Sequence, residues 1–386
     1  MYSHWLFSSY IFHSPTRLIF GLGTRKMVSS EASKYGKKAL IIIDGNIEAI
    51  KKEIEGYLEQ SSLKVDIYDK IYSEPTVESV NDALKYARSI EPDVIIGVGG
   101  GSTLDTAKVV SGLLINRMDI REIFGVDRVP RKGIPLILMP TTAGTGSEVD
   151  RTAVISDGYI KKVVISHNIA ADTAIVDPEL TVSCPPKVTA FTGIDTLTHA
   201  IEGMISLTSS PLIDALALEI VRLVDKYLRR AYYNGRDIEA RFYMSFAATL
   251  GGFILSSTTM VYGHSISYTL SRYKIPHGLG TGFALPYIVK INADLVQEKM
   301  LRIASILNIE DKDPRRSSRK VIEWITQLLQ DLRIPRSLRE MGIPREDLKN
   351  LAREMIEVYP RPNNPRQLTI EEAEKLYEEM WDGTLT

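Results

Sequence analysis

Three of the six histidines in this chain of 386 residues lie in short segments that are rich in possible metal ligands. His199 follows Asp195 by four positions in GIDTLTHA, so a helix would place both side chains on one face. His264 lies in GHSISY and His277 in PHG. One carboxylate and three imidazoles form a donor set suited to Fe²⁺, Zn²⁺, Co²⁺ or Ni²⁺. An Asp/His pair on a helix is also commonly a simple hydrogen-bonded pair, and spacing alone leaves both interpretations open.

Other candidate ligands are few. His4, His13 and His167 lack such neighbours, and we interpret them as structural. The single cysteine, Cys184, excludes an internal disulfide and any Cys-rich zinc or iron–sulfur site.

A glycine-rich segment, GGGSTLDTAK at residues 99–108, follows a buried strand and opens a helix. Successive glycines let the backbone approach a ligand closely, and the amides and dipole at the helix N-terminus favour a pyrophosphate. The alternative for its polar side chains is structural, because Ser102 and Asp105 have the spacing of a capping box. The candidate cofactor-binding residues in this segment are Gly99, Gly100, Gly101, Ser102 and Asp105.

A second polar loop, PTTAGTGSE at residues 140–148, follows another strand. Its hydroxyl groups are good donors to a phosphate, a ribose or a carboxamide, although a loop that only caps the next helix is the plainer alternative. The candidates here are Thr141, Thr142, Thr145 and Ser147.

Asp44 ends the first buried strand and precedes a glycine. A carboxylate there would bond an adenosine ribose and repel a 2′-phosphate, which favours NAD over NADP. The competing interpretation is an aspartate that only shapes the turn.

The elements that must position these residues alternate in the first half of the chain. Short apolar runs at 39–43, 94–98 and 134–139 predict buried parallel strands, and the spacing of apolar residues at 77–87 predicts a helix. Strands that alternate with helices predict a mostly parallel sheet covered on both faces.

Beyond residue 183 the segments become long, helical and nearly free of strand signals, as at Pro211 to Tyr233. We therefore expect an α/β domain at 1–182 and an all-α domain at 183–386.

Composition narrows the class of protein. Hydrophobic residues make up 44% and charged residues 25%, which are ordinary globular values. Forty-seven basic and 48 acidic residues give a net charge of -1, which makes no case for nucleic acid or an anionic membrane surface as partner. With neither a long uncharged apolar run nor a basic-then-apolar start, we expect no membrane span and no signal peptide, and a cytoplasmic protein.

Taken together, these segments resemble the iron-containing (group III) alcohol dehydrogenases, relatives of glycerol dehydrogenase and dehydroquinate synthase. The likeness covers nearly the whole chain in the family's order. It rests on GGGSTLDTAK (99–108), PTTAGTGSEV (140–149), DPEL (177–180), GIDTLTHAIE (193–202), the His264 and Pro276–Gly278 segments, and Asn364–Arg366.

The resemblance implies a dehydroquinate synthase-like fold, with a Rossmann-like NAD(P) domain, a helical metal-binding and substrate domain, and a homodimer. It implies that Asp195, His199, His264 and His277 ligate a divalent metal, with Fe²⁺ favoured and Zn²⁺ an alternative. It assigns Gly99–Ser102 to the pyrophosphate and Thr141, Thr142 and Thr145 to cofactor contacts. Asp44 falls where members often carry the carboxylate that favours NAD. Lys162 corresponds to a lysine beside the cofactor ribose, and a surface lysine is its alternative.

One position departs from the family pattern. Members commonly carry His-x-x-x-His where this sequence has His264 followed by Tyr268, so a tyrosine replaces a histidine near the nicotinamide. A branch acting as hydroxyacid–oxoacid transhydrogenases shares the tyrosine. We expect Tyr268 either to relay a proton or to serve as an aromatic wall of the pocket.

The expected function is metal-dependent hydride transfer between a small alcohol or aldehyde and a nicotinamide cofactor, NAD with NADP possible. The first alternative is the transhydrogenase, with a tightly held nicotinamide and hydroxy-acid substrates. A dehydroquinate synthase-type lyase and a non-catalytic sensor of metal or NAD complete the alternatives.

Overall fold

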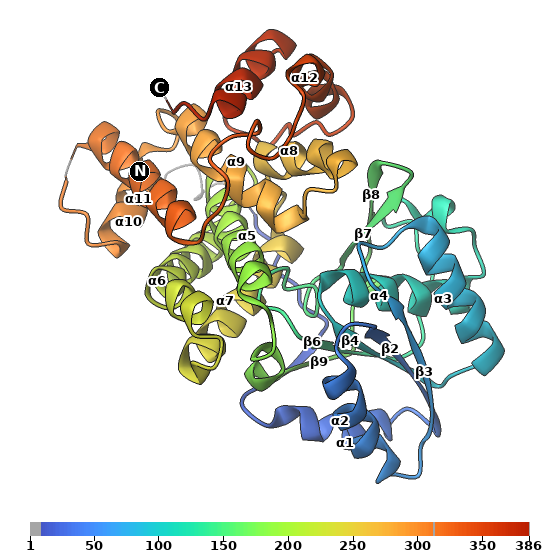
Figure 1. The fold of residues 1–386 in the computed structure, drawn as a ribbon. Coiled ribbons are helices and arrows are strands. Elements are labelled where there is room, and N and C mark those ends of the chain that lie inside the picture. Colours follow the sequence, from blue (N-terminus) through green and yellow to red (C-terminus); the bar gives the residue numbers. More distant parts are fainter. Residues whose placement is uncertain (1–8, 312, 386) are drawn as a thin grey trace. The chain divides into compact units, whose positions relative to one another are not determined.

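A six-stranded, fully parallel sheet forms the frame of the N-terminal half in the computed structural model, which describes residues 9–311 and 313–385 (Figure 1). Its spatial order is β1-β9-β6-β4-β2-β3. The strands are β1 (Arg17–Phe20), β2 (Lys38–Asp44), β3 (Lys64–Ile71), β4 (Val94–Gly99), β6 (Leu136–Pro140) and β9 (Thr173–Val176). The three strands expected from apolar runs, now β2, β4 and β6, lie side by side at its centre.

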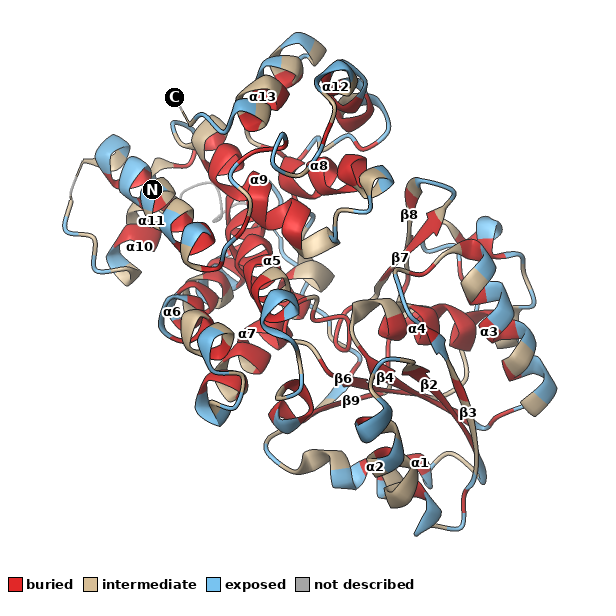
Figure 2. Cartoon of the chain, in the orientation of Figure 1, coloured by how far each residue is buried: buried red, intermediate tan, exposed pale blue. Residues whose placement is uncertain are grey.

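Helices cover both faces of this sheet (Figure 2). On β2, Leu40 and Ile42 belong to a core cluster that includes residues of α3 (Val77–Ile90) and α4 (Gly101–Asn116). Alternate residues of the same strand, such as Ile41, belong to the opposite cluster with α1 (Val28–Ala32) and α2 (Glu48–Glu59). Both faces of β2 are apolar because a parallel strand is buried on both sides. The sheet architecture predicted from the sequence is confirmed.

A second sheet was not foreseen. It has three strands in the order β5-β8-β7, namely β5 (Gly125–Val126), β7 (Thr152–Asp157) and β8 (Ile160–Ile165). β7 and β8 form an antiparallel hairpin around Gly158, which has a φ of 65°. These strands are short and half-polar, so they lack the continuous apolar run that marks the central strands.

The second half of the chain is helical, and no strand follows β9 in the described residues, as the sequence predicts. The helices are α5 (Pro186–Ile205), α6 (Pro211–Tyr233), α7 (Ile238–Ser257), α8 (Tyr262–Leu270), α9 (His277–Asn292), α10 (Gln297–Ile306), α11 (Pro314–Asp331), α12 (Leu348–Glu357) and α13 (Ile370–Asp382). By length and composition, no single helix in the described ranges could cross a membrane, and only the bent pair of α7 with Tyr262–Tyr273 meets that test together.

The chain divides into two compact units, and the division near residue 184 has two exceptions. The first unit joins His13–Cys184 with Gly235–Ser256, which is almost all of α7. The second joins residues 9–12 with Pro185–Asn234 and the residues from Ser257 onward. The expected boundary at 182/183 differs from this grouping in the placement of α7, which packs on the α/β unit, and of residues 9–12, which belong to the helical unit.

Two facing glycines explain why α7 packs there. A Cβ at Gly146, in the second polar loop, would overlap the backbone of α7 at Ala248 and Gly252. A Cβ at Gly252 would overlap the carbonyl oxygen of Gly146. Gly146 also has a φ of 63°, a conformation that other residues adopt only with strain. The absence of both side chains lets the loop and the helix touch.

Two histidines that we interpreted as structural lie together in the α/β unit. The rings of His13 and His167 have centroids 4.7 Å apart, and Arg151 Nη1 lies 3.3 Å from His167 Nε2. His4 lies outside the described residues.

We predict that Gly146→Ala destabilises the α/β unit well beyond the cost of its backbone strain. Gly158→Ala is the matched control, because Gly158 has nearly the same φ of 65° but no atom within 4 Å of an added Cβ. Overpacking should add about 1–3 kcal/mol to the loss of unfolding free energy at position 146. Denaturant unfolding of the two variants gives this difference, and equal losses would show that the glycine contact does not hold α7.

Candidate metal centre and cofactor loops

Four side chains converge inside the helical unit. Asp195 and His199, one turn apart on α5, have carboxylate Oδ2 and imidazole Nε2 atoms 3.7 Å apart. The His264 ring, from α8, has its centroid 5.2 Å from that of His199. Asp195, His199 and His264 are buried, and each offers a ligand atom within 4.8 Å of the others. His277, the first residue of α9, is 29% exposed and places Nε2 3.8 Å from Asp195 Oδ1.

Glycines on α9 allow these helices to approach so closely. A Cβ at Gly278 would overlap the carbonyl oxygen of Phe191 on α5, and one at Gly282 would overlap Ile194. Gly280 faces α8 instead, where an added Cβ would lie 2.7 Å from Ser267 Oγ. The segment HGLGTG therefore brings His277 against both α5 and α8.

A buried carboxylate orients one of the imidazoles. Glu202, fully buried on α5, has Oε2 2.9 Å from His264 Nδ1, and the same oxygen accepts a hydrogen bond from Val261 N at 2.9 Å. Burial raises the pKa of Glu202, while the Arg361 charge and the hydrogen bonds with Val261 and His264 lower it. A Cβ at Gly263 would overlap Glu202 Oε1, so this glycine makes room for the carboxylate. With Nδ1 engaged, the ring presents its other nitrogen, Nε2, to the centre.

Two further ligand candidates, His277 and Asp195, are oriented in the same manner. Ser267 Oγ lies 3.0 Å from His277 Nδ1, so His277 also turns its Nε2 toward Asp195. Thr281 Oγ1 donates to Asp195 Oδ1 at 2.8 Å. Each of the two imidazoles thus has an oxygen partner on Nδ1, an arrangement common around protein-bound metals.

Sequence analysis missed these supporting residues. Glu202 lies within the quoted GIDTLTHAIE motif, but nothing in its spacing pointed to His264, which is 62 positions away. Ser267 and Thr281 are common residue types with no local signal. For Glu202 the available hint was its spacing, because it follows His199 by three positions and Asp195 by seven, so a helix places all three on one face.

The chemistry of this cluster fits a divalent transition metal. His264 Nε2 is buried and has no hydrogen-bond partner among the described residues, an expensive condition that a metal ion would relieve. Burial, aided by the nearby imidazoles of His199 and His277, holds the pKa of His264 well below its usual value, so the ring is neutral. Neutral imidazoles and one carboxylate are what such an ion requires of its ligands.

The glycine segment of the α/β unit lies where such sheets bind ligands. The chain leaves β2 for the edge strand β3 and returns to β4 on the other side of β2, so strand order reverses between these two strands. Open parallel sheets bind ligands outside the carboxyl ends of the strands at such a point. Gly99 ends β4, Gly100 precedes α4 and Asp44 ends β2.

The loop of threonines packs directly on the glycines. Thr141 N donates to Gly99 O at 3.0 Å, and a Cβ at Gly101 would lie 2.6 Å from Thr145 Cγ2. Thr142 lies 3.5 Å from the position of a Cβ on Gly100. The two candidate segments, 42 positions apart at Gly100 and Thr142, therefore form one polar surface at the start of α4.

The expected capping box at Ser102 and Asp105 is wrong. Helix α4 begins at Gly101, so Ser102 is already inside it, and the N-cap is Gly100 without a side-chain bond. Asp105 instead accepts hydrogen bonds from Ser147 Oγ at 2.6 Å and from Val154 N at 2.8 Å.

A buried lysine completes this network beneath the loops. Lys108 is fully buried and donates to Ser147 Oγ at 2.8 Å, to Thr152 O at 2.9 Å and to Asp150. Ser147 and Asp105, both candidates for cofactor contact, are thus occupied in joining α4 to the second loop. Their observed hydrogen bonds stabilise the two loops and do not point to a ligand.

Asp44 and Lys162 are placed apart from that network. Asp44 Oδ1 accepts from Asn46 N and from Asn46 Nδ2, both at 2.9 Å, which is the turn geometry anticipated as its alternative role. Its Oδ2 has no bond with another described residue. Lys162 is a half-buried residue of β8, and no described contact links it to the glycine segment.

Tyr268 lies against the metal cluster. Its ring is 5.7 Å from that of His277 at an interplanar angle of 29°, and Tyr359 packs edge-on at 5.3 Å. The residue is 8% exposed. The tyrosine therefore occupies the position beside His277 in which a proton relay or an aromatic wall was expected.

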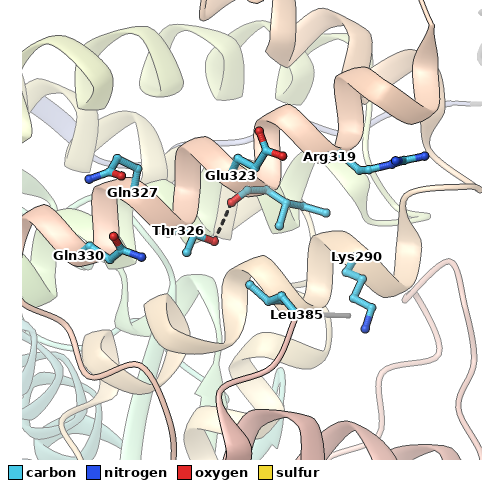
Figure 3. A pocket seen from close by; sticks show the side chains of 8 residues that line it. Lys290, Arg319, Glu323, Thr326, Gln327, Gln330 and Leu385 are labelled. Carbon is cyan, nitrogen blue, oxygen red and sulfur yellow. Dashed lines mark hydrogen bonds between the residues drawn. The ribbon is translucent and has the colours of Figure 1, made fainter.

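Figure 3 shows an open pocket of about 550 Å³ elsewhere in the helical unit. It lies along α11 and α9 and contains none of the candidate residues. Long side chains line it, those of Ile322 and Leu385 being apolar, and Lys290 there pairs with Glu379 at 2.8 Å. The lining residues include Lys290, Arg319, Glu323, Thr326, Gln327 and Gln330. This pocket offers no group able to perform the chemistry expected of the buried cluster.

Comparison with known proteins identifies the family. Residues 15–178 match the family described as iron-containing alcohol dehydrogenase, and residues 189–381 match the C-terminal part of the Fe-containing alcohol dehydrogenase family. The chain belongs to the iron-containing alcohol dehydrogenases. It is accordingly an NAD(P)-dependent oxidoreductase of alcohols and aldehydes, and the predicted family and reaction class are confirmed.

Individual relatives agree with this family. The chain is 37% identical over 350 residues to the sulfoacetaldehyde reductase of Bilophila wadsworthia, covering 88% of this chain and 90% of that protein. A crystal structure of a 1,3-propanediol oxidoreductase superimposes with a TM-score of 0.92 at 28% identity, over 97% of this chain and all of the other. The sulfoacetaldehyde reductase of Bifidobacterium kashiwanohense in complex with NAD⁺ gives 0.86 at 28% identity, over 97% and 99%.

We predict that Glu202→Gln weakens metal binding about 10- to 100-fold, because the neutral amide no longer fixes and polarises His264. Glu219→Gln is the control, since Glu219 is partly exposed and pairs with its neighbour Arg222 on α6. Competition with a chelator gives the affinity for Fe²⁺ or Zn²⁺. Equal affinities in both variants would mean that the Glu202 hydrogen bond does not support the centre.

Proposed function

We propose that Asp195, His199, His264 and His277 hold a divalent metal at the reaction centre of this dehydrogenase. The observation that carries the proposal is the buried, unpartnered Nε2 of His264, which faces a carboxylate and two imidazoles while its Nδ1 is held by Glu202. A divalent ion bound there supplies Lewis acidity toward the oxygen of an alcohol or aldehyde.

The chain's own residues prepare that site. Burial keeps His264 neutral, Ser267 and Glu202 fix the ring orientations of His277 and His264, and Thr281 holds the Asp195 carboxylate. Tyr268 borders His277 and provides a phenol for holding a proton near the substrate oxygen.

The cofactor proposal concerns the α/β unit. Gly99, Gly100, Gly101 and Ser102 present backbone amides at the start of α4 to the pyrophosphate, and Thr141, Thr142 and Thr145 flank them. Asp44 binds the adenosine ribose, and Lys162 lies beside a ribose of the cofactor. The bound nicotinamide supplies or accepts the hydride. Asp105 and Ser147 support the loops from below.

Substrate identity does not follow from similarity. The relatives bear the names of a sulfoacetaldehyde reductase, a long-chain-alcohol dehydrogenase and a 1,3-propanediol dehydrogenase, so their compounds differ in charge and length. The proposal is therefore a small alcohol or aldehyde. We also propose a homodimer, from the family resemblance, and a cytoplasmic location, from the composition. The proposed domains are residues 1–182 and 183–386.

The direct test is turnover of the metal-loaded chain with a panel of alcohols and aldehydes and free NAD⁺ or NADH. Net change in NADH absorbance supports the dehydrogenase. Hydride exchange between hydroxy and oxo acids without release of NADH would favour the transhydrogenase, and no turnover with either would contradict both.

We predict that His277→Ala removes the metal and lowers turnover at least about 100-fold while the fold is retained, because Lewis acidity contributes several kcal/mol to the reaction. His13→Ala, which alters a histidine of the other unit, should retain both the metal and the turnover of the unmodified chain. Elemental analysis and circular dichroism give metal content and fold. Full turnover of a metal-free His277→Ala chain would overturn the assignment.

Changes at Asp44 test the choice of cofactor. Asp44→Gly should raise the ratio of kcat/KM for NADP over NAD about tenfold, because loss of the carboxylate removes a charge-assisted bond to the ribose and the repulsion of a 2′-phosphate. Asp44→Asn retains an oxygen for the turn with Asn46 but loses the charge, and it should shift the ratio in the same direction. Unchanged ratios in both would leave Asp44 as a turn residue only.

A further inference from the structure

A cationic side chain borders the metal cluster and has no role in the function proposed so far. Arg361 lies between α12 and α13, with its guanidinium carbon 5.8 Å from the centre of the Tyr268 ring. That ring in turn stacks on His277 at 5.7 Å. The guanidinium is therefore one aromatic ring away from a candidate metal ligand.

The Nε edge of the guanidinium is held by a hydrogen bond, and its terminal amino groups remain to bind a ligand. Arg361 Nε donates to Ser265 Oγ at 2.9 Å, and this fully buried hydroxyl donates to Tyr359 O at 2.7 Å. No carboxylate of a described residue lies within ion-pair distance of Arg361. The side chain is half-buried, so its terminal amino groups retain donors for a ligand.

The backbone that carries Arg361 is rigid although it is neither helix nor strand. Pro360 and Pro362 flank the residue and restrict its neighbours' torsions. Asn363, nearly buried, donates from Nδ2 to Ser206 Oγ at 2.8 Å and to Thr259 O at 2.6 Å.

The next residue anchors the segment a second time. Asn364 is fully buried and donates from Nδ2 to Asn292 Oδ1 at 3.0 Å and to Arg366 O at 2.6 Å. Its backbone N donates to Arg361 O at 2.9 Å. The loop thus fixes Arg361 in advance of any ligand, which reduces the entropy lost on binding.

Compensation of the buried Glu202 charge is the competing explanation for this arginine. The Arg361 charge does lower the pKa of Glu202 and of His264, which places it within electrostatic reach of the centre. Glu202, however, directs Oε2 to Val261 N and His264 and does not form an ion pair with Arg361. The two explanations differ in what loss of Arg361 would do to an uncharged substrate.

We propose that Arg361 binds an anionic group on the substrate, so that the centre selects short alcohols and aldehydes that carry a sulfonate or carboxylate. This inference rests on the proposed function and specifies its substrate class. The guanidinium fork matches the paired oxygens of either anion. The guanidinium lies over the aromatic ring of Tyr268. Charge, fixed geometry and adjacency to His277 together define a subsite for the end of the substrate remote from the reacting carbon.

The test compares three alcohols of similar size with the metal-loaded chain and NAD⁺: 2-hydroxyethanesulfonate, 3-hydroxypropanoate and the uncharged 2-(methylsulfonyl)ethanol. We expect kcat/KM for at least one of the anions to exceed that of the sulfone at least tenfold. The larger of the two anionic values identifies sulfonate or carboxylate as the group. An unmodified chain that oxidises the sulfone as well as both anions would overturn the inference while the proposed function stands. A chain that oxidises no alcohol at all would instead contradict the proposed function.

Arg361→Gln should lower kcat/KM for the favoured anion about 10- to 100-fold, mostly through KM, the range expected for a charge-assisted bond. The value for the sulfone should change less than about threefold. Arg361→Lys keeps the charge without the fork and should give an intermediate loss. Arg353→Gln, an exposed arginine of α12 paired with Glu357, is the control and should behave as the unmodified chain. Equal decreases in kcat/KM for the anion and for the sulfone would show that Arg361 only compensates the charge of Glu202.

Binding without turnover provides an independent measurement. Calorimetric titration with ethanesulfonate should show an affinity at least tenfold weaker for Arg361→Gln than for Arg353→Gln. Equal affinities would overturn the inference. Circular dichroism and metal content verify both variants, and the Arg361→Lys chain serves for titration if Arg361→Gln does not fold.

Discussion

The hydrogen bond between the buried Glu202 carboxylate and His264 Nδ1 is the interaction on which the candidate centre depends. It fixes the ring so that a buried nitrogen without a hydrogen-bond partner faces Asp195 and His199. A buried carboxylate and a buried imidazole are both costly alone, and each is stabilised here by the other. The remaining cost, at His264 Nε2, is what a bound cation would offset.

Glycine has a structural purpose in both units of the chain. In the helical unit, Gly278 and Gly282 let α9 contact α5, and Gly263 makes room for Glu202. In the α/β unit, Gly146 and Gly252 let a polar loop contact α7. In each case the missing Cβ allows a close approach, and that approach brings polar side chains together. The positions of these glycines therefore determine much of the geometry of the candidate site.

Chemistry in the two units is prepared in different ways. The α/β unit offers backbone amides at a helix start, and a fully buried Lys108 with Asp105 and Ser147 holds the loops around them. The helical unit offers side chains, and three of them, Asp195, His264 and His277, have an oxygen partner behind them. Amides suit the diffuse charge of a pyrophosphate, and a few fixed donors suit a compact cation and the substrate oxygen.

Features that short stretches of sequence encode could be predicted before the structure was known. The apolar runs gave β2, β4 and β6, the long helices gave an all-α second half, and residue types with short spacing singled out the glycine loop and the Asp195/His199 pair. The other features depend on contacts between distant segments and were seen only in the folded chain. In the helical unit they are the approach of His264 and His277 to that pair and the bond from Glu202 to a histidine 62 positions away. In the α/β unit they are the attachment of α7 and the bonding of Asp105 to Ser147 in place of a helix cap. Helical and strand periods are local properties of a chain, whereas the partner of a buried polar group is chosen only when the segments pack.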